Sequence, residues 1–193
     1  MIRVNQGPFR TGALITPNII LGSHRNRVNK ITRIQVVFRE SNGDDWLSPV
    51  AGYYLYESQL ILKLQLAISV SISPITISHP IPVSNVSGIF VGANQETGMM
   101  YQVPVRVHNP HWCKATGFLL ESWETCFGED GNLSPVLSST HLGGVIIYNN
   151  TLLGIRTKRS HSSREQAPHS VVILFEMGSW MIPLQSLEGI NKL

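Results

Sequence analysis

The sequence has little charge, few cysteines and no long apolar run. Charged residues make up 14% of its 193 residues, and the formal net charge of +3 is too small to indicate nucleic-acid binding. The stretch 60–77 is interrupted by Lys63, Gln65 and Pro74, so it falls short of the roughly 20 apolar residues that a membrane span requires. Residues 1–8 lack the apolar centre of a secretory signal, so export is not indicated by the sequence itself. We expect a soluble protein without a nucleic-acid or membrane partner.

The composition favours a folded β protein. A chain of this length can bury the core of one large β domain or of two small ones. Hydrophobic residues make up 42% of it, and its 16 glycines and 11 prolines are spread along the whole length. That balance is typical of an all-β protein with many turns, and not of a helical or disordered chain.

Short apolar or alternating runs, separated by turn residues, predict strands along most of the chain. A turn at 16–18 divides the first run, and the two prolines of 75–83 are typical of a linker or an edge segment. A helical pattern is expected only at 179–190, where Trp180 and Leu187 belong to an apolar stripe. Many short strands with one terminal helix indicate a barrel or a sandwich. The predicted strands are 13–21, 31–40, 53–66, 88–91, 99–108, 143–148, 151–158 and 171–175.

A glycine-rich run near the C-terminal end resembles a known catalytic signature. It reads Thr140-His141-Leu142-Gly143-Gly144-Val145-Ile146, where the trypsin family has Gly-Asp-Ser-Gly-Gly-Pro-Leu. The following run, 148–155, ends in Gly-Ile at the spacing of that family. The resemblance places Leu142 at the position of the attacking serine. A leucine side chain has no lone pair to attack a carbonyl carbon, so acyl transfer there is impossible.

The resemblance continues over most of the chain. The run 11–24 is similar to the family's Gly-Gly-Ser-Leu-Ile, a turn and Val-Leu-Thr-Ala-Ala-His, which places His24 at the general-base histidine. The run 57–64 is similar to Asn-Asp-Ile-Met-Leu-Ile-Lys-Leu, which places Ser58 at the aspartate that orients that histidine. Trp180 matches the tryptophan of the family's C-terminal helix.

The departures from the family pattern come in coupled sets. Ser58 cannot supply the buried charge that holds the imidazole tautomer, and Leu142 cannot attack, so only His24 of the triad remains. Without its partners, we expect His24 to be a packed residue and not a base. His141 replaces the aspartate that binds the freed amino terminus, and this chain begins after the point where the family's Ile-Val-Gly-Gly strand would lie. Thr140 replaces the glycine of the oxyanion hole.

Cysteine usage departs from the family in pairs as well. Arg10 and Arg25 stand where the family bridges the histidine loop, and Ser138 replaces the cysteine before the nucleophile. Cys113 and Cys126 match the bridge that closes the loop after a second-barrel strand, so the resemblance implies a disulfide between them. A cysteine pair at this spacing favours an extracellular protein.

A basic segment, 156–164, is the most distinctive surface that the sequence predicts. The resemblance places it at the wall of the primary specificity pocket, with Val136 at the pocket floor and His169 where a glycine leaves room for the substrate side chain. A preference for Lys or Arg substrates is therefore not expected. The segment is either a solvated loop without a ligand or a patch for acidic peptides or sulfated sugars. The residues expected to bind are Arg156, Lys158, Arg159 and Arg164.

Two further motifs are weaker. The cluster 108–113 has residue types that bind metals, but Cys113 is assigned to the disulfide and no other residues complete a tetrahedral site. We therefore expect no metal and no cofactor. Triplets beginning at Asn85, Asn132 and Asn149 match the acceptor pattern of N-linked glycosylation, which matters only if the protein is secreted.

These observations predict an all-β fold of two six-stranded antiparallel barrels of the trypsin type, the first truncated at its N-terminus, with a short C-terminal helix. The chain would be one domain with lobes 1–80 and 81–193. Its expected function is that of a non-catalytic serine protease homologue of the insect type. It would bind a protease, an inhibitor or a glycan, as a cofactor or decoy in a secreted protease cascade. The alternative is an active endopeptidase in which Ser138 or Ser139 supplies a relocated nucleophile to His24.

Overall fold

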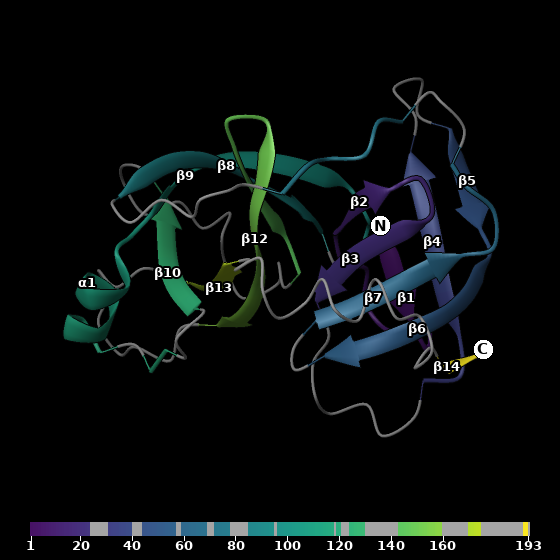
Figure 1. Ribbon diagram of the computed structural model, residues 1–193, viewed down its shortest axis with the longest axis horizontal. Coiled ribbons are helices and arrows are strands. Elements are labelled where there is room, and N and C mark those ends of the chain that lie inside the picture. The colour runs from purple at the N-terminus through teal and green to yellow at the C-terminus, as the bar shows by residue number, and fades with distance from the viewer. Residues whose placement is uncertain are drawn as a thin grey trace.

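The protein, seen in a computed structural model, has two β lobes that lie side by side (Figure 1). The first lobe contains the strands of residues 2–64 together with 191–192, and the second contains those of residues 86–174. The structure describes residues 1–23, 31–39, 44–56, 59–68, 72–77, 85–94, 96–117, 119–120, 124–129, 143–159, 170–174 and 191–192.

The first lobe is built from two antiparallel sheets. One has the strand order β1-β4-β5 and the other the order β14-β6-β7-β3-β2. The bounds are β1 (Ile2–Val4), β2 (Gly12–Thr16), β3 (Ile19–Ser23), β4 (Ile34–Arg39), β5 (Asp45–Ser48), β6 (Val50–Tyr56), β7 (Gln59–Leu64) and β14 (Asn191–Lys192). Within the described residues these strands form two separate sheets and do not pair into one closed ring.

The two sheets of the first lobe enclose one hydrophobic core. Ile2 and Val36 of the first sheet pack with Leu60 and Leu62 of the second, and none of the four is more than 1% exposed. Burying an apolar side chain of this size contributes about 1.5–3 kcal/mol to folding. At the start of β4, buried and half-buried residues alternate. In β7, the run Leu60-Ile61-Leu62 is buried on both faces, because Ile61 packs toward the second lobe.

The second lobe is a closed six-stranded antiparallel barrel with the strand order β10-β13-β12-β11-β8-β9, as expected. Phe90, Phe127 and Ile146 fill its interior and are fully buried, with the two phenylalanine rings 5.5 Å apart. The bounds are β8 (Val86–Ala93), β9 (Met100–Val107), β10 (Glu124–Glu129), β11 (Val145–Tyr148), β12 (Thr151–Arg159) and β13 (Ser170–Leu174).

Two tight turns agree with the turn residues of the sequence. β2 and β3 form a hairpin around the expected turn, where Thr16 Oγ1 donates to Asn18 Oδ1 at 3.1 Å. Asn149 and Asn150 join β11 to β12 with positive φ angles of 46° and 57°. Asparagine tolerates this left-handed backbone better than other residues with a side chain, and two such residues make the turn that suits the twist of a hairpin.

The described part of the chain has a short helix, α1 (Pro110–Ala115), where none was expected. Asn109 caps it, since its Oδ1 accepts a hydrogen bond from the His111 N–H at 2.8 Å, and Pro110 supplies the first turn. Six residues are too few to show helical periodicity in a sequence. The expected helix at 179–190 lies outside the described residues. Among those residues, no helix is long and apolar enough to cross a membrane.

An apolar cluster joins the two lobes. Leu21 and Ile61 of the first lobe pack with Val145 and Leu152 of the second, and all four are buried. The segment expected to be a linker runs across this contact: the Leu152 N–H donates to the Thr76 carbonyl at 2.7 Å. β3 and β7 are thereby held against β11 and β12.

Candidate functional site

Three chain segments meet where the lobes join. β3 ends at Ser23, which pairs with Gln59 at the start of β7. Gly143 approaches from the second lobe, and a Cβ atom added to it would lie 2.8 Å from Ser23 Oγ. Arg10 lies beside Ser23 and Gly143. Its Nη1 donates to the Ser23 carbonyl at 3.2 Å, and its Cβ would be 3.1 Å from the Cβ atom added to Gly143. We call Arg10, Ser23, Gln59 and Gly143 the junction site.

The junction site borders the positions that the resemblance assigns to a catalytic triad. Ser23, Gln59 and Gly143 are each the direct chain neighbour of one of these positions. The triad positions, which lie outside the described residues, are His24, Ser58 and Leu142. The other sequence-predicted positions outside them are Arg25, Asn132, Val136, Ser138, Ser139, Thr140, His141, Arg164, His169 and Trp180.

The junction site is lined by buried polar residues that the sequence analysis missed. Thr11, Ser23 and Gln59 are each 5% exposed or less. In the described structure, Thr11 Oγ1 and Gln59 Oε1 make no hydrogen bond. A buried polar atom without a hydrogen-bond partner lowers the stability of the fold by about 1–3 kcal/mol. Thr11 and Gln59 therefore destabilise this end of the sheet. Their signal in the sequence is a polar residue at the head of an apolar strand, as in Gln59-Leu60-Ile61-Leu62.

The glycine pair of the signature has a structural reason that does not depend on catalysis. Gly143 has a φ of +88°, a backbone conformation that residues other than glycine rarely adopt. Gly144 packs directly against the Phe90 ring, and its carbonyl accepts a hydrogen bond from the Arg156 N–H at 2.8 Å. Gly143 thus lets the backbone pass close to the first lobe, and Gly144 lets it pass close to the Phe90 ring inside the second lobe.

Arg156 is not a surface residue, contrary to the expectation from the basic segment. It is 1% exposed, and its guanidinium lies 5.9 Å from the centre of the Phe90 ring. Burial raises the pKa of the Tyr101 hydroxyl above its ordinary value, and the nearby positive charge of Arg156 offsets part of that rise. The expectation was wrong because residues 152–156 are all buried. In this part of β12 both faces of the strand are covered, so the alternation of side chains does not predict which residues are exposed.

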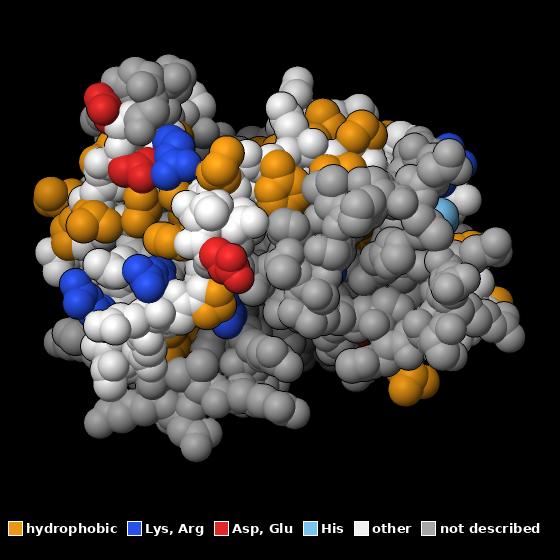
Figure 2. Space-filling view, turned by 180° about the vertical axis from the view of Figure 1, so that it is seen from behind, with side chains coloured by type: hydrophobic (Ala, Val, Ile, Leu, Met, Phe, Trp, Pro, Cys, Tyr) orange, Lys and Arg blue, Asp and Glu red, His pale blue; other side chains and the backbone are white. Residues whose placement is uncertain are grey.

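The rest of the basic segment is described only in part. The backbones of Lys158 and Arg159 lie in β12 and pair with Val171 and Ser170 of β13. Seen from behind, the Lys and Arg side chains of the described residues are spread among apolar and polar side chains (Figure 2). A basic patch formed by this segment would therefore have to come from 158–164 without Arg156.

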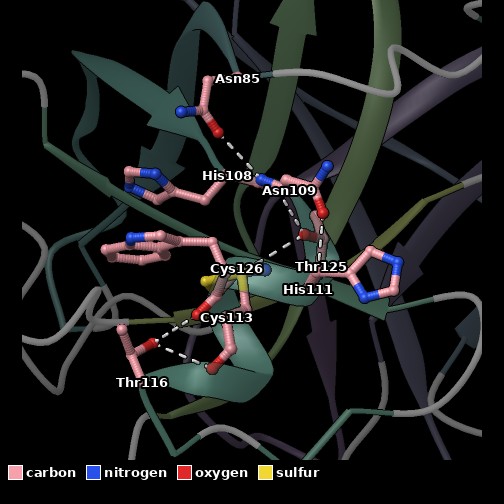
Figure 3. Close-up of a disulfide and its surroundings, with 9 residues drawn as sticks. Asn85, His108, Asn109, His111, Cys113, Thr116, Thr125 and Cys126 are labelled. Carbon is pink, nitrogen blue, oxygen red and sulfur yellow. Dashed lines mark hydrogen bonds between the residues drawn. A yellow bond between two sulfur atoms is a disulfide. The ribbon is translucent and has the colours of Figure 1, made fainter.

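The expected disulfide between Cys113 and Cys126 is confirmed (Figure 3). It links α1 to β10, and both cysteines are fully buried. Thr125 Oγ1 donates to the His108 carbonyl at 2.6 Å, and the His108 N–H donates to the Cys126 carbonyl at 2.9 Å. The bridge therefore fixes the helix and the end of β9 on the outer end of the barrel.

The cluster 108–113 is occupied by packing and capping contacts. The His108 ring stacks on Trp112 with centroids 4.3 Å apart, and Asn109 caps the helix. Over the ranges that the structure describes, no group of three or more His, Cys, Asp or Glu residues is placed to hold a metal ion.

A partly open pocket of about 330 Å³ lies elsewhere, at the surface of the first lobe. Leu14, Val36 and Phe38 line it together with Met100 from the second lobe. None of its lining residues belongs to the junction site, so the pocket and the junction site are separate features.

The structure is similar to those of several serine proteases and protease paralogues. It matches kallikrein-related peptidase 10 with a TM-score of 0.76 at 13% identity, over 97% of this chain and 93% of the other. It matches the scabies mite inactivated protease paralogue S-D1 with a TM-score of 0.75 at 15% identity, over 100% and 93%. The paralogue S-I1 from the same mite gives a TM-score of 0.67 at 18% identity, over 92% and 86%. No protein-family model and no curated protein sequence matches the chain.

At identities this low, the likeness establishes the fold. The chain has the two-lobed β fold of the trypsin-like serine proteases, as the sequence resemblance implied. The proteins that share it include ones named as peptidases and paralogues described as inactivated, so the fold alone does not decide whether this chain is active.

Proposed function

We propose that this chain is a non-catalytic serine protease homologue that acts outside the cell by binding another protein or a glycan. The observation that carries the proposal is the junction site. Ser23, Gln59 and Gly143, the chain neighbours of the three triad positions, meet there within hydrogen-bonding and van der Waals distance. This meeting supports the register of the resemblance, and in that register the nucleophile is Leu142 and the orienting acid is Ser58.

The chemistry of these residues argues against acyl transfer. Leucine cannot attack a carbonyl carbon, and serine cannot supply the negative charge that orients and stabilises a protonated imidazole. With His24 alone, the family mechanism has neither its nucleophile nor the group that activates its base. The similarity in fold to two mite paralogues that are described as inactivated supports the same proposal, because this fold also occurs in proteins described in that way.

The disulfide supports an extracellular setting. A buried Cys113–Cys126 bridge forms and persists in an oxidising compartment, and secreted proteins are its usual context. We propose that the lobes 1–80 and 81–193 act as one rigid domain that presents loops around the junction site. In such proteins function is carried by the loops that a rigid scaffold positions.

The proposed partner is a protease or an inhibitor of a secreted cascade, bound in the manner of a cofactor or decoy of the insect type. An acidic peptide or a sulfated glycan would instead use the basic residues Lys158, Arg159 and Arg164. Partner identification by affinity purification of the native protein, followed by mass spectrometry, would distinguish these classes.

Labelling with a fluorophosphonate probe tests the loss of catalysis. The probe reacts with activated serines, so active trypsin is labelled as a positive control, and this protein is expected to remain unlabelled. Labelling of Ser138 or Ser139 that disappears in a His24→Ala variant would show a relocated nucleophile and overturn the proposal. Labelling that survives this substitution would show a serine activated by other groups, which also contradicts it.

A further inference from the structure

The proposed function leaves the glycosylation triplets unused, and among them is Asn85-Val86-Ser87 at the start of β8. Asn85 is exposed to solvent, and so is Ser87. The triplet lies at the outer end of the second barrel, beside the helix that the disulfide fixes (Figure 3). A triplet of this kind is common by chance, so it needs structural support before it indicates a modification.

The first support is the orientation of the Asn85 side chain. Its Oδ1 accepts a hydrogen bond from the backbone N–H of Asn109 at 3.0 Å. Because the carbonyl oxygen is used in this way, the amide nitrogen is directed away from Asn109. Figure 3 shows this nitrogen on the same side as the His108 ring. The nitrogen that would carry a sugar therefore lies toward the side on which the His108 ring lies, next to Asn109.

The second support is the surface beside that nitrogen. The His108 ring stacks on Trp112 with an interplanar angle of 25°, and Trp112 is 42% exposed although it is a large aromatic residue. The pair is held rigidly, because Asn109 caps α1 and Cys113 in the same helix is bonded to Cys126. A rigid, partly exposed aromatic pair offers a flat apolar face of the kind on which sugar rings pack through their C–H groups.

We infer that Asn85 carries an N-linked glycan whose first sugar packs against the His108–Trp112 pair. In the transfer, the Asn85 amide nitrogen forms a bond to C1 of the sugar, the bond from C1 to the diphosphate of a lipid-linked oligosaccharide breaks, and the nitrogen gives up one proton as the lipid diphosphate leaves. No oxidation or reduction takes place. The inference rests on the extracellular setting proposed above, and it gives Trp112 a reason to be exposed.

Occupancy is tested by producing the chain with a cleavable secretion signal in eukaryotic cells and mapping its glycopeptides by mass spectrometry. We expect a glycan at Asn85 in the wild type and in Ser87→Thr, which keeps the acceptor triplet, and none at this residue in Ser87→Ala. An unmodified Asn85 in the secreted wild type overturns the inference. That result would leave the proposed binding function standing, because binding does not require a glycan at this residue.

Packing is tested with Asn85→Asp, which keeps an oxygen to accept the Asn109 hydrogen bond but cannot be glycosylated. We expect Asn85→Asp to lower the melting temperature of the secreted protein by about 2–4 °C, and to lower it much less in a Trp112→Leu background. Equal shifts in both backgrounds would show that the sugar does not pack on Trp112. After enzymatic release of N-glycans, which leaves aspartate at the site, the wild type and Asn85→Asp should melt at the same temperature.

Discussion

Gly143 lies so close to Ser23 that a Cβ atom on residue 143 would be 2.8 Å from the Ser23 hydroxyl oxygen. The φ of Gly143 is +88°, so a side chain here would strain the backbone as well as collide with the first lobe. We expect Gly143→Ala to lower the free energy of unfolding by about 2–4 kcal/mol, from left-handed strain and overpacking together. Urea unfolding followed by fluorescence would measure it.

Gly117 provides a matched control for this prediction. Its φ is +98°, but a Cβ atom there would meet nothing within 4 Å. Gly117→Ala should therefore cost only the backbone strain, about 1–2 kcal/mol. If the two variants were equally destabilised, the contact between Gly143 and Ser23 would contribute nothing, and the geometry of the junction site would be wrong.

The disulfide should contribute measurably to stability, because it closes a loop with a sequence separation of 13. In the chain-entropy model a loop of about this size is worth about 3 kcal/mol. We expect the double variant Cys113→Ala/Cys126→Ala to be less stable than the wild type by roughly that amount in urea unfolding. A reducing agent should destabilise the wild type to a similar extent and leave the double variant unchanged. A wild type indifferent to reduction would contradict the prediction.

Several elements could be predicted from the sequence because their signals are local. The β2–β3 hairpin follows from turn residues at 16–18, and the β11–β12 hairpin from the strand patterns on both sides of Asn149 and Asn150. The pairing of Cys113 with Cys126 followed from the family resemblance and not from the pattern of the residues themselves.

Other elements could not be predicted because their signals are weak or depend on distant contacts. β5 has four residues and α1 has six, which is too few for periodicity to emerge. The junction site depends on Ser23, Gln59 and Gly143, which are far apart in the sequence and meet only after both lobes have formed. Its polar residues therefore carry no recognisable motif of their own.

Arg39 and Asp45 should make stability depend on pH. The Arg39 guanidinium donates two hydrogen bonds of 2.7 Å to the carboxylate and holds the pKa of Asp45 below its ordinary value. A carboxyl group with a lowered pKa in the folded state stabilises the fold above its unfolded pKa, about 3.9, and loses this effect as the pH falls through the folded value. The wild type should be more stable than Asp45→Asn at pH 6, and the difference should vanish toward pH 2.

The solvent exposure of Arg39 and Asp45 provides a control for this prediction. Both side chains are more than a third exposed, so salt should screen the interaction. The difference between the wild type and Asp45→Asn at pH 6 is therefore expected to shrink in 1 M NaCl. A difference that does not depend on pH would show that Asp45 acts through packing or turn geometry and not through its charge.

Arg156 should behave as a buried residue and not as part of a binding surface. The Arg156 side chain is 1% exposed and lies near Phe90 and Tyr101. Methionine at this position would keep most of the apolar contacts, but it would remove the buried positive charge. We expect Arg156→Met to lower the free energy of unfolding by about 2 kcal/mol, which is the usual value of a desolvated cation–π contact. Thermal and urea unfolding would measure this loss.

The same variant separates stability from binding. Retention of the folded protein on heparin should be unchanged in Arg156→Met, because the guanidinium does not reach solvent, whereas Lys158→Gln/Arg159→Gln should elute at lower salt if these residues form the basic patch. Reduced retention of folded Arg156→Met would show that Arg156 is accessible to an anionic ligand and would contradict its buried position. Unchanged retention of Lys158→Gln/Arg159→Gln would remove the basic segment as a glycan site and leave protein binding as the function to pursue.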